Sequence, residues 1–117
     1  MAENIILDKS YAFAKEIVLY CLEVQTTKRE YVLSRQLLRS ETSIGANVEE
    51  AIGGFSKKDF RYKMSIAYKE SRESTYWLRL LRDTEIGEVE RAKQLLKELE
   101  EISRILFKIV KNSKTES

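Results

Sequence analysis

Histidine and proline are absent from this chain of 117 residues, which holds only one cysteine and four glycines. Without histidine, the chain cannot form a Ser–His or Cys–His catalytic pair or the Glu-x-x-His motifs of di-iron bundles. Zinc sites built on histidine, or on several cysteines, are excluded as well. A sequence so poor in turn-forming residues is also unsuited to a fold with many strands, so the composition favours an all-α protein.

The sequence also indicates where the protein is located in the cell and how its charge is distributed. The residues MAENIILDKS lack the regions of a signal peptide, and no apolar run approaches the roughly 20 residues of a membrane span. We therefore expect a cytoplasmic protein with no membrane partner. Its net charge of +2 is only mildly basic, and the excess of Lys and Arg lies between residues 28 and 82. The lone Cys21, among Val18, Leu19 and Leu22, is expected to be a buried small hydrophobic residue.

Helical periodicity of apolar residues runs through four segments and predicts a single domain over residues 1–117. The expected helices cover about 9–26, 29–53, 57–84 and 88–112. Short connections make consecutive helices antiparallel, so we predict an up-down-up-down four-helix bundle.

Capping residues suggest where these helices begin and end. Asp8 or Ser10 can cap the first helix, and Thr26 to Lys28 form the expected break after it. Gly53-Gly54 is suited to end the second helix because glycine adopts a left-handed backbone at low cost. Ser56 is a typical cap for the third helix, and Ile86-Gly87 provides the last turn.

Two helical faces can be assigned from spacing. The first helix is predicted to bury Tyr11, Ala14, Ile17, Val18, Cys21 and Leu22. The third helix carries a heptad seam with small residues in its middle: Phe60, Met64, Ala67, Ser71, Ser74, Leu78 and Leu81. Small residues let helix backbones approach closely, so we expect a short-range contact with another helix at this point.

The second helix has a polar line of side chains, Gln36, Ser40, Ser43, Asn47 and Glu50. Such residues are mediocre helix formers and need partners when they are buried, either on other helices or on a second copy of the chain. We interpret Ser43, Asn47, Glu50 and Glu70 as a structural polar network or interface, and the polar and small seams together favour a homo-oligomer.

Three further groups of residues were weighed as sites. Glu49, Glu50, Glu70 and Glu73 could in principle form an all-carboxylate metal site, but a structural role is favoured and no metal or cofactor is expected. Gly53-Gly54 before Ser56 suggests an anion site at a helix N-terminus, but it lacks the P-loop spacing and a preceding strand. Lys57, Lys58, Arg61 and Lys63 form a candidate nucleic-acid-binding patch, with a solvated basic turn as the alternative.

The runs TSIGANVEEAIGGFSKKDF and KMSIAYKESRESTYWLRLL resemble the four-helix-bundle family of 23S rRNA-intervening-sequence proteins of bacteria. The shared pattern includes Ser43-Ile44, Asn47-Val48, Glu50, Gly53-Gly54 and Trp77-Leu78, and it spans about residues 36–82. The chain departs from the commoner pattern at Glu49 and Ala51, where Ala and Gly are often found.

The resemblance implies a left-handed bundle, commonly a homopentamer, with no established activity. A related branch is similar to the accessory variability protein of diversity-generating retroelements, which is thought to bind nucleic acid. We therefore expect a non-enzymatic oligomer that binds RNA, DNA or a ribonucleoprotein through its basic central helices. The alternatives are an oligomeric protein-interaction scaffold without nucleic-acid affinity and, less favoured, a small-molecule or metal binder that uses inward carboxylates.

Overall fold

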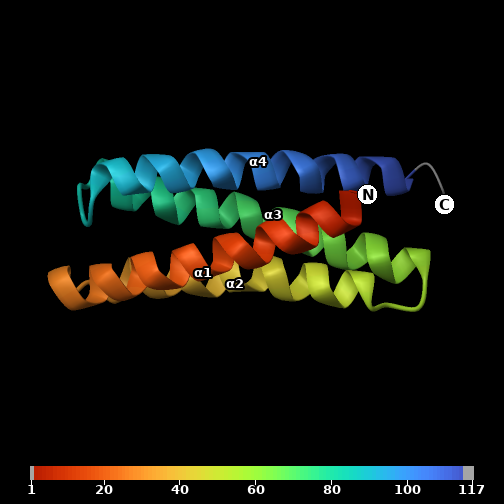
Figure 1. Ribbon diagram of the computed structural model, residues 1–117, viewed down its shortest axis with the longest axis horizontal. Helices are drawn as coiled ribbons and strands as arrows, with labels where there is room; N and C mark the ends of the chain where they lie inside the picture. Colours follow the sequence, from red (N-terminus) through yellow and green to blue (C-terminus); the bar gives the residue numbers. More distant parts are fainter. Residues whose placement is uncertain (1, 115–117) are drawn as a thin grey trace.

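The computed structural model describes residues 2–114, with side chains described for residues 5–113, and contains four α-helices. They are α1 (Ala2–Lys28), α2 (Val32–Ile52), α3 (Lys57–Asp83) and α4 (Val89–Lys114). Consecutive helices run antiparallel in a bundle about 47 Å long (Figure 1). Both α1 and α3 pack on α2 and α4, so α1 and α3 lie diagonally opposite each other in the bundle. The predicted all-α four-helix bundle is confirmed. None of the described helices is long and apolar enough to cross a membrane.

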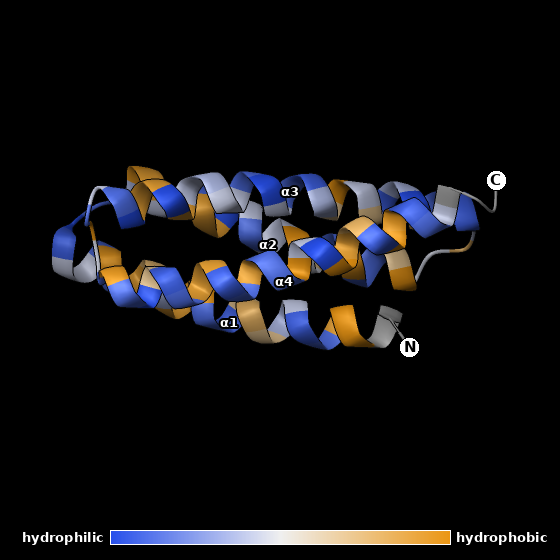
Figure 2. Cartoon of the chain, turned by 90° about the horizontal axis from the view of Figure 1, so that it is seen from above, coloured by the Kyte–Doolittle hydropathy of each residue, from blue (hydrophilic) through white to orange (hydrophobic). Residues whose placement is uncertain are grey.

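The core lies along the bundle axis, where the hydrophobic sides of the helices meet (Figure 2). The spacing predicted the buried side of α3 correctly from Met64 onward, whereas Phe60 at the start of the seam is only partly buried. In α3 the buried seam residues are Met64, Ala67, Ser71, Ser74, Leu78 and Leu81. In α4 they are Ala92, Leu95, Leu99, Ile102, Ser103, Leu106 and Ile109. Full burial of each Leu or Ile contributes roughly 1.5–3 kcal/mol.

The small residues of the α3 seam bring two neighbouring helices close through paired hydroxyls. The Oγ atoms of Ser40 on α2 and Ser74 are 2.8 Å apart, and Ser103 on α4 donates to Ser71 Oγ at 2.9 Å. Because each buried hydroxyl has a partner, the seam brings the backbones close without leaving these polar atoms unsatisfied.

The structure corrects the predicted first helix. It begins at Ala2, so neither Asp8 nor Ser10 is a cap, and the buried Ser10 hydroxyl donates to the Leu7 carbonyl within the helix. Tyr11 and Leu22 are exposed, whereas Phe13 and Tyr20 are buried. The reason is that α1 has apolar residues on most of its circumference, so periodicity alone does not determine which side faces the core.

The first break also lies later than predicted. Thr26 and Thr27 are helical, and the chain leaves α1 at Arg29, which has a positive φ of 52°. The carboxylate of Glu30 then accepts hydrogen bonds from the backbone N–H groups of Leu33 and Ser34, at 2.7 and 2.9 Å. This side chain satisfies first-turn donors of α2, so the helix begins at Val32 rather than at 29.

The α2–α3 connection is placed as predicted, but its glycines act differently. Helix α2 ends at Ile52, and Ser56 Oγ accepts the Asp59 N–H at 3.0 Å, so the predicted cap is confirmed. Neither Gly53 nor Gly54 has a positive φ. Gly54 instead lies close to the Asp59 carboxylate, and a Cβ there would be 2.4 Å from Oδ2 and would require that side chain to move. At the α3–α4 turn Gly87 does adopt a left-handed φ of 82°.

Candidate nucleic-acid interface

The outward face of α3 carries cationic side chains along most of its length. Lys58, Arg61, Lys69, Arg72 and Arg79, here called the α3 stripe, recur at spacings that keep them on one helical face. The stripe extends about 32 Å at a rise of about 1.5 Å per residue. The tyrosines at positions 62 and 76 lie on the same face and are exposed. Hydrophilic colouring predominates along this edge of the bundle in Figure 2.

Along the middle of α3 the stripe lies apart from acidic side chains, because Glu70 and Glu73 face α2 instead. Arg39 on α2 pairs with Glu73 and lies 3.6 Å from Glu70. A hydrogen bond from Trp77 Nε1, at 3.0 Å, and the contact with Arg39 lower the pKa of Glu73. Within residues 5–113, no member of the stripe has a carboxylate within ion-pair distance. Opposite charges are therefore segregated onto two sides of the middle of α3, whereas at its end Asp83 pairs with Arg82, and the hydrogen bond from Arg82 together with the charges of Arg82 and of the nearby Arg79 lowers the pKa of Asp83.

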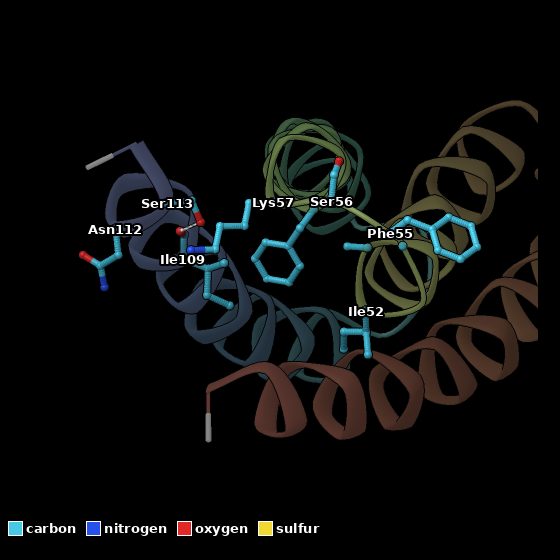
Figure 3. A pocket seen from close by; sticks show the side chains of 10 residues that line it. Ile52, Phe55, Ser56, Lys57, Ile109, Asn112 and Ser113 are labelled. Carbon is cyan, nitrogen blue, oxygen red and sulfur yellow. Dashed lines mark hydrogen bonds between the residues drawn. The ribbon is translucent and has the colours of Figure 1, made fainter. Parts of the chain in front are cut away.

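The four predicted nucleic-acid-binding residues fall in three different places. Lys58 and Arg61 begin the stripe. Lys63 faces α2, where it donates to the Glu50 carboxylate at 2.8 Å, and this hydrogen bond raises the pKa of Lys63. Lys57 lies at the end of the bundle (Figure 3). The structure thus brings two of the four together and adds Lys69, Arg72 and Arg79, which the helical spacing of cations could have revealed.

Lys57 lines a pocket of about 460 Å³ between the start of α3 and the end of α4. Its side chain extends toward Ile109 and Ser113 of α4 (Figure 3), where a cation is favoured by the helix C-terminus. The first turn of α3 already holds the Ser56 cap and the carboxylate of Asp59, which opposes a bound anion. The geometry is therefore that of a helix cap rather than of a phosphate loop.

The predicted polar network lies along the α2–α3 contact but is not uniformly buried. Ser43 Oγ donates to Glu70 at 3.1 Å and thereby joins the two helices. Asn47 Nδ2 donates to the carbonyl and the hydroxyl of Ser43, at 2.8 and 3.1 Å, so these bonds stay within α2. Glu50 is exposed, and within residues 5–113 its one contact of this kind with α3 is the ion pair with Lys63.

The carboxylates weighed as a metal site do not converge. Arg39 binds Glu70 and Glu73, Lys63 binds Glu50, and Glu49 is exposed. Across the described part of the chain, no group of three or more Cys, Asp and Glu residues could hold a metal ion.

A buried carboxyl group that sequence reasoning missed lies in the core. Glu41 on α2 is 0% exposed, and neither Oε1 nor Oε2 has a hydrogen-bond partner among the described residues. Burial raises the pKa of Glu41 to about 8. Burial, followed by the influence of Glu41, also raises the pKa of the Cys21 thiol on α1 to about 12, and Cys21 is buried as predicted. The signal was present, because Glu41 falls on the apolar line between Leu37 and Ile44.

The outward side of α1 is unusually apolar for a helix at the surface. Its exposed apolar residues, here called the α1 face, are Ile5, Tyr11, Leu19 and Leu22. Leu19 is 67% exposed although it is large and fully apolar. Beside it, a groove between α1 and α2 is lined by small residues including Ala14, Gly45 and Ala46. Apolar surface of this kind, rimmed by polar residues, is typical of an interface.

The protein is a small four-helix bundle, and its most distinctive chemical features are the cationic α3 stripe and the apolar α1 face on its surface. The family model for the 23S rRNA-intervening sequence protein matches residues 2–108, and the chain belongs to this family. It is similar to a solved protein of unknown function from the S23 ribosomal protein family of Bacteroides thetaiotaomicron VPI-5482. The two are 41% identical with a TM-score of 0.91, over 95% of this chain and 99% of that one. No curated protein matches the chain.

Proposed function

We propose that the protein is a non-enzymatic homo-oligomer, most simply a pentamer, that binds nucleic acid or a ribonucleoprotein through the α3 stripe. The observation that carries this proposal is the row of five cations without carboxylate partners, interleaved with Tyr62 and Tyr76. Phosphate groups are suitable partners because Lys and Arg that neutralise them release condensed counterions. Contacts to phosphates alone carry no base information, so the stripe itself is expected to bind with little sequence preference.

Assembly is supported by the α1 face. Helices α1 and α3 lie at opposite edges of the bundle in Figure 2, so subunit contacts on α1 leave the stripe free. A ring repeats the stripe once per subunit, and multivalency then raises avidity although the net charge of each chain is only +2. The family resemblance implies a pentamer and a likeness to the retroelement accessory protein, and this implication agrees with the same assignment.

We expect the purified protein to have a mass several times its chain mass of 13.7 kDa. Replacing Leu19 and Leu22 together by Glu is expected to lower that mass, because charged groups replace the apolar contacts of an interface. Light scattering at micromolar concentration measures this. Tyr62→Glu, on the opposite side of the bundle, is the matched control and should leave the mass unchanged. A wild-type particle of 13.7 kDa would contradict assembly.

Nucleic-acid binding is tested with the wild-type protein and labelled RNA, single-stranded DNA and duplex DNA. We expect retention at about 50 mM salt and loss of a thousandfold or more in affinity by about 200 mM if six or more phosphates are neutralised. If none of the three ligands is retained at the lower salt, the second candidate function stands instead. That candidate is an oligomeric protein-interaction scaffold, and it is favoured by the fully exposed ring of Phe55 at the α2–α3 turn.

A further inference from the structure

An aromatic groove runs between α3 and α4 beside the α3 stripe. It has a volume of about 700 Å³, which lies within the usual range of ligand pockets. The rings of Tyr68 on α3 and Phe107 on α4 meet in this groove, with centroids 5.7 Å apart and planes inclined by 54°. Phe107 is 51% exposed, so part of its ring remains available for contact with a ligand.

The charges around this groove are not balanced. Arg72 lines it and also belongs to the α3 stripe, and Lys108 lines it from α4. Neither cation has a carboxylate partner within the described residues, whereas the acids of the rim do have partners. Glu100 pairs with Arg104, and Glu101 pairs with Lys9. The groove therefore combines exposed aromatic surface with uncompensated positive charge, and the two features are continuous through Arg72.

We propose that this groove stacks bases of a single-stranded nucleic acid whose phosphates lie along the α3 stripe. The inference rests on the proposed function and narrows its ligand to single strands. Proteins that bind single strands combine a cationic track with aromatic side chains that stack on unpaired bases. In a duplex the base faces are already stacked on one another, so Phe107 can contribute only when the bases are unpaired.

The test compares three ligands of equal length: a pyrimidine single strand, an abasic strand with the same backbone, and a duplex. We expect the wild-type protein to bind the pyrimidine strand roughly tenfold or more tightly than the abasic strand. Phe107→Ala should lose most of this difference and should bind the abasic strand as the wild type does. Phe107→Tyr keeps an aromatic ring and should retain the preference, whereas Phe107→Leu keeps an apolar side chain and should lose it.

Equal affinity of the wild type for pyrimidine and abasic strands would overturn the inference and leave the stripe as a phosphate site. Unchanged discrimination by Phe107→Leu would overturn it too, because the ring would then not be stacking. If Phe107→Ala changes the mass of the oligomer, the groove is an interface between copies of the chain and the inference fails. Failure of the wild type to bind any of the three ligands at about 50 mM salt would instead refute the proposed function itself.

Discussion

Replacing Glu41 by Gln is expected to remove a fall in stability that the wild-type protein shows between about pH 5 and pH 8. In the unfolded chain this carboxyl group loses its proton near its model value of 4.5, whereas in the folded protein it holds the proton up to about pH 8. Folding therefore takes up one proton between these values. Over that range the free energy of unfolding falls by roughly 1.4 kcal/mol per pH unit as the pH rises, and the loss levels off above about pH 8.

The cause is desolvation, because Glu41 is fully buried and both its carboxylate oxygens lack partners among the described residues. Cys21 on α1 does not compensate, since a thiol with a pKa near 12 carries no positive charge and is neutral throughout this range. Urea unfolding at pH 5, 6.5 and 8, at one fixed protein concentration, measures the effect. Glu49→Gln, on the same helix but exposed, should keep the wild-type slope and change stability by less than about 0.5 kcal/mol.

Wild type and Glu41→Gln giving parallel pH curves would contradict this account of the buried acid. At pH 8 the variant should be the more stable of the two proteins, because the wild type must either hold an uncompensated charge in its core or remain protonated at a cost. Glu41→Met, of similar volume and fully apolar, should show the same flat pH profile with higher stability throughout.

Reversing the charge of Lys58 and Lys69 is expected to weaken nucleic-acid binding by at least a hundredfold at about 100 mM salt. Each change removes one phosphate contact and places an anion on the track, so attraction becomes repulsion at two points along the stripe. The fold should survive, because both side chains are exposed and Glu is as good a helix former as Lys. At position 58 a carboxylate is even favoured by the helix N-terminus.

The matched control is Lys28→Glu with Arg35→Glu, two exposed cations on α1 and α2 that lie off the stripe. This pair changes the net charge by the same amount and should reduce binding by far less. Fluorescence anisotropy with a labelled single strand measures both variants, and circular dichroism checks that each remains helical. Equal losses in the two variants would mean that overall charge, rather than the α3 stripe, determines affinity.

The features that sequence predicts well are those in which one helical face is clearly apolar. The seam of α3 from Met64 to Leu81 follows from spacing alone, and the Ser56 cap follows from local chemistry. For α1 the same method placed Tyr11 and Leu22 inside, because that helix is apolar on its outer side as well as toward the core. Periodicity cannot choose between two apolar faces, and only the packing of neighbouring helices decides.

The candidate interface shows the same limit. Sequence reasoning placed Lys57, Lys58, Arg61 and Lys63 in one patch at the start of the third helix, but a helix turns successive residues to different sides. Lys63 finds Glu50 on α2, and Lys57 reaches the end of α4. What makes Lys69 and Arg72 available is that Arg39 holds Glu70 and Glu73 on the other side of α3. That separation depends on which helix packs beside which, and no local pattern reveals it.

The most direct test of the proposed phosphate contacts is the salt dependence of binding by a variant in which Lys58 and Lys69 are replaced by Gln. The logarithm of the binding constant of the wild type should fall linearly with the logarithm of the salt concentration. For a single strand, the slope of the variant should be shallower by about 1.4 for each protomer in contact, because two phosphate contacts are lost. A slope equal to that of the wild type would show that the α3 stripe does not contact phosphates.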